Sequence, residues 1–497
     1  MRSAVAAAVL SVFLAGGCFH RHALPPLPPE VLRAGLTRED YALRQSFAAG
    51  RFDEALGFVS PKGKFAPGDE LLAALYRASA LYYAGRFDTS GVALDRAAAL
   101  ADDRYTKSVS RNLLAAVTSD GALPYEPSQT ERLMMNYYGM LDFLRRGDAE
   151  GAAVEARRVS ALLESFDSRK DSVDVRTRAL LNYLAGAAFE AAGEKNDAAV
   201  SYRVARALVG DSALPFPAEP KKPRRQRGAA RAATEPPTGE VLVVVEHGYV
   251  AHRVPRLVLV PVTQEEFDKF GGKPEETAAA AAAISARAML WIATDQDRFL
   301  WHDEDDDREL RVRDDSREIA YLLPVAWSSL QRPWHPAWRA SLVVDSTTRR
   351  PFGVNADLCD AVANDFRRAR AASFARGVVR AGLKLALAKT AADKIEDRKG
   401  ELAGTVARWA TDAINVLTER ADIRQWRLLP GELSVVRLTL PAGAHDLAID
   451  YATGAGGAPR RIALGRVEVI PGKIAFATTR VWEDGVTPGR RLVVSDR

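Results

Sequence analysis

Cysteine and histidine are scarce in this chain of 497 residues, which has two cysteines and seven histidines. No two histidines have the i, i+4 spacing that places a pair of zinc ligands on one face of a helix. The sequence also lacks a Gly-x-Ser-x-Gly nucleophile elbow and a glycine-rich phosphate loop. These absences argue against a zinc enzyme, a hydrolase of the elbow type and a P-loop enzyme, so no cofactor, metal or catalytic residue is predicted.

The histidines and the cysteines still allow two chemical roles, a metal site and a nucleophile. His247 and His252 flank Gly248. A shared metal ion is one interpretation, but their spacing is not a metal motif and a structural role is favoured. Cys359 has no histidine beside it to activate a thiolate, so a small buried apolar residue is favoured over a nucleophile.

An apolar run near the N-terminus is the clearest targeting feature. Residues 4–14 are uncharged, follow Arg2 and are too few to span a bilayer. They lead into Leu-Ala-Gly-Gly-Cys18, which resembles the lipobox that bacterial lipoprotein signal peptidase cuts. We therefore predict a lipoprotein signal peptide at residues 1–17 and lipidation of Cys18. The alternative is an ordinary secretory signal cut near Gly17.

Lipidation of Cys18 determines the expected location. Acyl chains there, palmitate among them, would anchor the chain stably in a membrane. Phe19 stands where an aspartate would retain a lipoprotein at the inner membrane, which predicts the periplasmic face of the outer membrane of a Gram-negative bacterium. Residues 18–35 are proline-rich and are expected to be a tether. With Cys18 lipidated, Cys359 has no partner for an intrachain disulfide.

A short repeat indicates paired helices at residues 36–217. The sequence AGRFD occurs at residues 49–53 and again at 84–88, an offset close to the tetratricopeptide period. In such repeats the glycine closes the turn between two helices and the aromatic residue begins the second. Weaker copies at residues 146–149 and 193–197 bring the count to the number that a solenoid needs to bury its faces.

Residues 218–239 are predicted to be a linker. They are rich in proline and alanine and contain six basic and two acidic residues, a net charge of +4 in a chain whose total is +5. The basic character therefore belongs to the linker and not to a folded surface. A solvated hinge is favoured over electrostatic attraction to anionic lipid. No aromatic residue interleaves the charges, so nucleic acid is not an expected partner.

Residues 240–430 are predicted to be an α+β domain with long helices. Two strands rich in β-branched residues surround a turn at Gly248 and suggest a hairpin. The strands are expected at residues 240–246, 254–262, 319–327 and 339–345, and the shorter helices at residues 275–285 and 401–420.

A longer helical stretch at residues 357–398 contains few breakers. Gly377 and Gly382 are expected to interrupt it. Basic residues, including Arg376 and Arg380, fall among its apolar positions. A helix with one buried stripe is favoured over a helix that lies on a membrane.

Residues 431–497 alternate apolar and polar side chains in the manner of a small β-sandwich domain. Turns between the strands are marked by Pro-Gly and Pro-Ala-Gly sequences. The strands are expected at residues 433–440, 446–451, 461–470, 473–482 and 491–495.

Two side-chain clusters in the α+β domain invite a functional interpretation. Residues 295–307 include five consecutive acids, but they lack the spaced ligands of a calcium loop, so a solvated loop is favoured. Trp327, Trp334 and Trp338 form an aromatic patch with two prolines. Core packing is favoured there over glycan or peptide binding.

The most distinctive stretch spans residues 417–441. It resembles a family of uncharacterised proteobacterial outer-membrane lipoproteins in which a tetratricopeptide-like half precedes a β-containing half. The resemblance covers nearly the whole mature chain. It implies a role in the cell wall, because members are encoded near a lipoprotein activator of penicillin-binding proteins. The residues that match the family motif are Ala421, Asp422, Arg424, Trp426, Leu429 and Pro430.

Asp422, Arg424 and Trp426 are the candidate site residues outside the N-terminus. They lie where a helix is expected to give way to a strand. A charge-assisted hydrogen bond from Asp422 or Arg424 to the backbone would fix the conformation at the start of the following strand. Trp426 would fill the space between the helix and that strand. This structural role is favoured over a binding site. The linker is expected to let the two halves unfold separately.

The predicted fold is multidomain, with all-α tetratricopeptide-like repeats followed by an α+β region that ends in a small β-sandwich. The predicted function is a lipid-anchored scaffold that faces the periplasm and binds a protein partner, in cell-envelope or peptidoglycan assembly. The alternative is an envelope hydrolase or transferase that uses carboxylates of residues 295–307 or Asp422 as acid and base.

Overall fold

The computed structural model describes residues 27–33, 35–60, 70–111, 124–168, 173–217, 236–269, 273–293, 319–333, 337–399, 421–454 and 457–482. Several predicted features lie outside these residues. They are the signal peptide, Cys18, linker residues 218–235, the acidic segment 295–307, Trp334, the helix at 401–420 and the strand at 491–495. Within the described part, helices occupy the N-terminal half and sheets with helices the C-terminal half, which confirms the predicted order of an α region before an α+β region.

Helices of the N-terminal half come in antiparallel pairs joined by tight turns. A short helix, α2 (Pro29–Arg33), precedes them. The pairs are α3 (Arg38–Ala48) with α4 (Phe52–Phe58), α5 (Glu70–Tyr83) with α6 (Phe87–Arg111), α7 (Gln129–Arg146) with α8 (Ala149–Ser168), and α9 (Val175–Ala191) with α10 (Lys195–Val209).

The glycine of each repeat copy lies in one of these turns. Gly50, Gly85, Gly147 and Gly193 have φ values of 69°, 74°, 77° and 79°. A residue with a Cβ is strained in this left-handed region, whereas glycine is not. The second helix of the first two pairs begins at the aromatic residue that follows. The predicted roles of the glycine and the aromatic residue in the turn are therefore confirmed.

In the described part of the C-terminal half, the strands form two four-stranded sheets and a two-stranded ribbon. The first sheet has the order β10-β1-β7-β6, and the second has the order β5-β4-β8-β9. The strands of the first are β10 (Ile474–Val481), β1 (Thr238–His247), β7 (Glu432–Pro441) and β6 (Ala356–Asp357). Those of the second are β5 (Thr348–Phe352), β4 (Trp338–Val344), β8 (Gly443–Thr453) and β9 (Arg460–Val469). The ribbon pairs β2 (His252–Thr263) with β3 (Ile319–Gln331).

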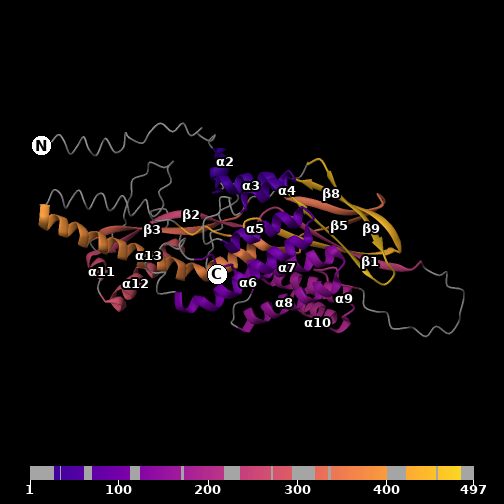
Figure 1. The fold of residues 1–497 in the computed structure, drawn as a ribbon, viewed down its shortest axis with the longest axis horizontal. Coiled ribbons are helices and arrows are strands. Elements are labelled where there is room, and N and C mark those ends of the chain that lie inside the picture. Colours follow the sequence, from indigo (N-terminus) through magenta and orange to yellow (C-terminus); the bar gives the residue numbers. More distant parts are fainter. Residues whose placement is uncertain are drawn as a thin grey trace.

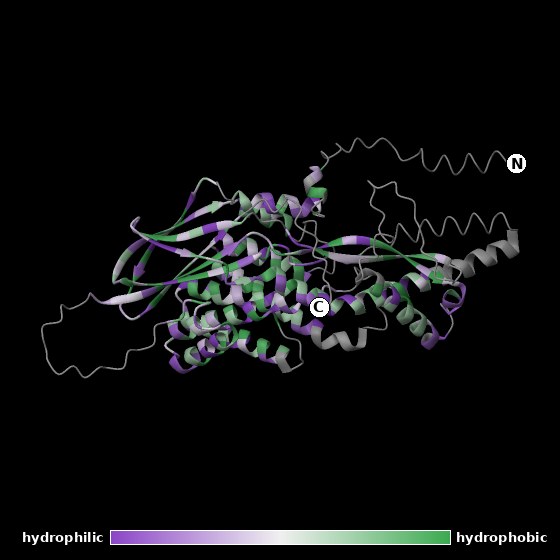
Figure 2. Cartoon of the chain, turned by 180° about the vertical axis from the view of Figure 1, so that it is seen from behind, coloured by the Kyte–Doolittle hydropathy of each residue, from purple (hydrophilic) through white to green (hydrophobic). Residues whose placement is uncertain are grey.

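Strand β1 lies between two apolar layers. Val241, Val243 and Val245 belong to a cluster shared with the second sheet. Leu242 and Val244 belong to a cluster shared with the repeat helices. A strand buried on both faces needs apolar residues at consecutive positions, which explains the unbroken run Val-Leu-Val-Val-Val in the sequence. Figure 2 shows apolar residues along these strands and the helices beside them.

Strand pairing corrects two predictions. The strands on either side of Gly248 do not form a hairpin, because β1 pairs with β7 and β10 while β2 pairs with β3. Residue 430 is not a boundary between sheets, because β1 joins β7 and β4 joins β8 across it. Each sheet therefore combines strands from both predicted C-terminal domains, a partnership that local alternation cannot reveal.

Three helices accompany the ribbon, which extends to one end of an elongated molecule (Figure 1). They are α11 (Gln264–Asp268), α12 (Pro274–Ala293) and α13 (Leu358–Lys399). Gly377 and Gly382 do not interrupt α13, which contradicts the prediction. A Cβ at Gly377 would lie 3.1 Å from a methyl group of Val325, so this glycine lets the helix approach β3 closely. Within the described residues no helix has the length and apolarity to span a bilayer.

The two halves of the chain share one hydrophobic core. A single cluster of buried side chains extends from Leu43 in α3 to Val435 in β7, with Trp426 among its members. We therefore expect the halves to unfold together, in contrast to the separate unfolding that the linker suggested, because both contribute side chains to this core.

Buried hydrogen bonds cross the same junction. The carboxylate of Glu246 in β1 accepts hydrogen bonds from the hydroxyls of Tyr83 (2.6 Å) and Tyr137 (3.0 Å). Arg480 in β10 donates to the hydroxyl of Tyr83 at 2.8 Å and to the carbonyl of Gly248 at 2.7 Å. Burial raises the pKa of Glu246, and the Arg480 charge opposes that shift. This network fixes α5 and α7 against the first sheet.

Candidate functional site

The segment after residue 420, which carries the distinctive motif, lies between the two halves. Trp426 is fully buried. Its indole nitrogen donates to the hydroxyl of Ser79 in α5 at 2.8 Å, and its backbone nitrogen donates to Glu131 in α7 at 2.6 Å. The indole lies 5.6 Å from the ring of Tyr138. Trp426 therefore seals the contact between repeat helices and sheet, a role like the predicted one but with the repeats as the partner.

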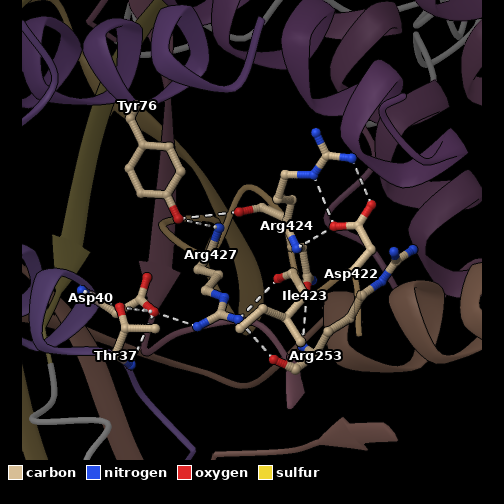
Figure 3. Close-up of polar contacts among 9 residues, drawn as sticks. Thr37, Asp40, Tyr76, Arg253, Asp422, Ile423, Arg424 and Arg427 are labelled. Atoms are coloured by element: carbon tan, nitrogen blue, oxygen red, sulfur yellow. Dashed lines mark hydrogen bonds and ion pairs between the residues drawn. The ribbon is translucent and has the colours of Figure 1, made fainter. Parts of the chain in front are cut away.

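Arg427 connects this segment to the first repeat pair (Figure 3). Its guanidinium forms an ion pair with Asp40 in α3 and donates to the carbonyl of Arg253 at 2.8 Å. Its backbone nitrogen donates to the hydroxyl of Tyr76, which donates in turn to the carbonyl of Gln425. Burial is the largest single influence and would raise the pKa of Asp40, but Arg427, the Thr37 hydroxyl and Arg44 together hold that pKa below the ordinary value.

Asp422 and Arg424 form a closed pair (Figure 3). Two guanidinium nitrogens of Arg424 donate to the carboxylate of Asp422 at 2.9 and 2.8 Å. The backbone nitrogen of Arg424 donates to the same carboxylate at 3.0 Å, which is the predicted charge-assisted bond. The Arg424 guanidinium lies 5.9 Å from the ring of Tyr125, so both partners hold it in one orientation.

This oriented arginine lines a pocket of about 610 Å³. The walls come from the segment before α7 and the start of α7, from α6, α8 and α13, from β2 and β3, and from the motif. The pocket therefore exists only where the two halves meet. Its arginines are Arg132, Arg253, Arg368, Arg370, Arg376 and Arg424, and its aromatic residues are Tyr125, Phe166, Trp327 and Phe366.

Positive charge exceeds negative charge among the described residues of the lining, whose carboxylates are Glu126, Asp365 and Asp422. Asp422 is engaged by Arg424, and Asp365 accepts a hydrogen bond from the backbone of Thr130 at 2.8 Å. Burial raises the pKa of Asp365, and the Thr130 bonds oppose that rise.

Not all of the arginines are alike. Arg132 pairs with Asp102 at 2.8 Å, and Arg368 donates to Gln129 at 2.7 Å. Arg253 is half-buried and Arg376 is exposed. In the described part of the chain neither of these two guanidinium groups is paired with a carboxylate. These two cations are available to a negatively charged ligand.

Aromatic side chains form an apolar wall beside the arginines. Trp327 of β3 is nearly buried and lies 5.6 Å, edge to face, from Phe374 of α13. Its ring is also 6.4 Å from that of Phe366. This packing confirms the core role predicted for Trp327. The same side chain also lines the pocket. The predicted core role of Trp338 is similar, since it stacks near His247 and donates to Glu432 at 2.7 Å.

No protein-family model, curated protein or solved structure matches this chain. The resemblance to envelope lipoproteins therefore stays a prediction. It rests on the same motif that the structure places at the junction, where Asp422 and Arg424 line the pocket and Trp426 packs behind it.

The remaining candidates from the sequence lie away from the pocket. His247 is buried, with one ring nitrogen 2.9 Å from the hydroxyl of Tyr451 and the other 3.2 Å from Glu432. Cys359 is buried, accepts a hydrogen bond from the backbone of Ala251, and has its pKa raised by burial to about 12. A thiol with that pKa is a poor nucleophile. Across the described residues no three potential ligands gather into a metal site.

Sequence reasoning missed most of the pocket. The sequence indicates Arg376 only as a charge within a helix, and it does not distinguish Arg253 or Arg370 from other surface arginines. The available signal was the abundance of arginine over lysine in the first part of residues 357–398. That signal does not show which of these side chains converge, because their convergence depends on the packing of α13 against β3 and α7.

Proposed function

We propose that this chain is a lipid-anchored scaffold of the bacterial envelope that captures a negatively charged ligand or partner group in the arginine pocket. In this proposal the repeat pairs are tetratricopeptide-like, the two four-stranded sheets form a β-sandwich, and Cys18 carries the anchor at the periplasmic face of the outer membrane. The cell-wall role rests on the resemblance of residues 417–441. The observation that carries the binding role is the pocket with six arginines at the junction.

The location of the pocket also favours it over the repeat helices as the binding surface. Solenoids commonly bind partners on a concave face. Here α5, one of the repeat helices, already contacts the chain's own strands. Tyr82 donates to Thr478 in β10 at 3.1 Å, and Tyr83 donates to Glu246 in β1. The pocket remains open to a ligand, and its volume falls within the range of about 300–1,000 Å³ that is usual for ligand sites.

The geometry of Asp422 supports binding more than catalysis. A general acid or base needs a carboxylate oxygen that can reach the substrate. Both oxygens of Asp422 instead accept hydrogen bonds from Arg424. This arrangement orients a guanidinium toward the pocket and leaves the carboxylate occupied.

The binding role predicts what co-purifies with the protein. Full-length protein isolated from envelopes in mild detergent is expected to retain a ligand or partner that is lost when Arg253 and Arg376 are both changed to Ala. An Arg350→Ala variant, which removes an exposed arginine of β5 outside the pocket, should retain it. Native mass spectrometry and peptide identification would compare the three samples. Identical recovery from all three would refute binding through the pocket.

The anchor makes a separate prediction. Cys18→Ser should move the protein from the membrane fraction to the soluble periplasmic fraction, because two or more acyl chains are needed for stable anchoring. Cys359→Ser is the matched control and should stay with the membranes. Fractionation and immunoblotting after a high-salt wash would check both. Retention of the Cys18→Ser variant would mean that another surface, such as α13, is a second anchor.

A further inference from the structure

We propose that the ligand group of the arginine pocket is a phosphoryl group, as a phosphate monoester, a phosphodiester or a pyrophosphate. This inference rests on the proposed binding function and names the chemistry of its ligand. Every cationic side chain of the described lining is an arginine, and none is a lysine. Arginine's planar fork of donors matches the oxygens of phosphate or carboxylate in a way that lysine does not.

The distribution of the arginines favours phosphate over carboxylate. The two arginines that have no carboxylate partner among the described residues come from different elements, Arg253 from β2 and Arg376 from α13. Arg424 of the motif lines the same pocket with its guanidinium held by Asp422. Donors that reach a ligand from several sides suit a tetrahedral group with oxygens in several directions. A carboxylate is planar and presents two oxygens on one side, so one or two arginines on one wall would serve it.

Among these phosphoryl groups, charge favours a monoester or a pyrophosphate over a singly charged phosphodiester. The described lining has six arginines against three carboxylates. Two of these arginines, Arg132 and Arg424, are already paired with Asp102 and Asp422. A phosphate monoester carries up to two negative charges near neutral pH, whereas a single carboxylate carries one. The available guanidinium groups of Arg253 and Arg376 provide the two positive charges that a monoester would neutralise.

The size and walls of the pocket limit the rest of the ligand. A cavity of about 610 Å³ holds a phosphorylated unit the size of a small molecule and not a folded domain. Trp327 and Phe366 give the organic part an apolar wall. Two sources carry such a group in the envelope, a soluble phosphate ester and the headgroup of an anionic lipid, and the experiment must separate them.

Binding of simple probes to the full chain tests the inference. Isothermal titration calorimetry with pyrophosphate, glycerol 3-phosphate and citrate would be run on the wild type, Arg253→Ala, Arg376→Ala and the Arg350→Ala control. We expect pyrophosphate to bind, and each pocket variant to weaken it about ten- to hundredfold, as expected for lost charge-assisted hydrogen bonds. Arg350→Ala should bind as the wild type does. Arg376 is exposed, so its variant keeps the test valid if Arg253→Ala fails to fold.

The source of the phosphoryl group is tested on the Cys18→Ser chain, which lacks the acyl anchor. Sedimentation with phosphatidylcholine vesicles, with and without phosphatidylglycerol, reports a lipid headgroup. Glycerol 3-phosphate binding without matching vesicle binding reports a soluble ester. Either result supports the proposal if Arg376→Ala weakens that binding about ten- to hundredfold, as it should weaken pyrophosphate binding.

Three results would overturn the phosphoryl assignment. Citrate binding as tightly as pyrophosphate would show a carboxylate site. Equal loss in Arg350→Ala would show non-specific charge attraction. If no phosphate probe binds, the ligand is not a phosphoryl group. If a partner still depends on Arg253 and Arg376 in the envelope preparation, the proposed binding function survives these results; if it does not, both proposals fail.

Discussion

Replacing Trp426 by Ala is expected to lower the free energy of unfolding by about 3–5 kcal/mol, the usual cost of truncating a large buried aromatic residue. Trp426 is fully buried in the cluster that contains both halves of the chain. The substitution removes its contact with Tyr138 and leaves the hydroxyl of Ser79 without the indole nitrogen. A loss of this size is a large part of the roughly 5–15 kcal/mol that stabilises a typical domain.

The loss should appear in a single unfolding transition. Calorimetry and urea denaturation followed by circular dichroism should show helices and strands melting together, at a lower temperature than in the wild type. Trp426→Phe is the matched control, because it keeps an aromatic ring and loses the indole hydrogen bond, so it should be destabilised less than Trp426→Ala. Two separated transitions, with only one of them shifted, would contradict the shared core.

Acidification from pH 8 to pH 5 is expected to stabilise the repeat helices through Asp142. This residue of α7 is fully buried, and within the described residues neither of its carboxylate oxygens has a hydrogen-bond partner. The nearby hydroxyl of Ser90 donates to the carbonyl of Ala78 instead. Burial raises the pKa of Asp142 from an ordinary value of 3.8 to about 7.

The direction of the pH effect follows from this raised pKa. Above pH 7 the carboxylate is charged in both states, and its burial costs the folded state about 4 kcal/mol, the free energy that corresponds to a shift of about three pH units. As the pH falls from 7 toward 4, the folded state takes up a proton before the unfolded state does, and the cost is relieved. Protonation of Asp142 therefore raises the free energy of unfolding as the pH falls.

Asp142→Asn tests this argument. The variant should be more stable than the wild type at pH 8, should keep less than half of that advantage at pH 5, and should show a flatter dependence on pH in denaturation experiments. Some dependence should remain, because burial also raises the pKa of Glu155 to about 7. Asp197→Asn, at an exposed position of α10, is the control and should change neither value. A wild type that loses stability between pH 8 and pH 6 would contradict the prediction.

Local structure was determined by local sequence. Gly50 and Gly85 fixed the turns of the first two helix pairs, because the left-handed backbone conformation there suits glycine and few other residues. The strand positions β7 to β10 follow from alternation and from turns at Pro-Gly sequences. These features depend on the conformational preferences of a few neighbouring residues, so the sequence alone was enough to predict them.

The partners of those elements were decided only by the tertiary structure. The run of valines in β1 indicated a buried strand, but not that β7 and β10 would flank it or that β2 would pair with β3. Gly377 was expected to break a helix and instead lets that helix pack against Val325. Strand pairing and helix packing depend on contacts between residues far apart in the sequence, which local patterns do not encode.

In the candidate site, too, the sequence predicted some features and only the tertiary structure revealed others. The sequence identified Asp422, Arg424 and Trp426 as a unit, because their types and spacing suggested a charged pair and an aromatic seal. It did not show that Arg253 and Arg376, from a strand and a helix elsewhere in the chain, line the same pocket as Arg424. A pocket formed where the two halves meet exists only after both have folded onto the shared core, and for that reason only the three-dimensional structure could reveal it.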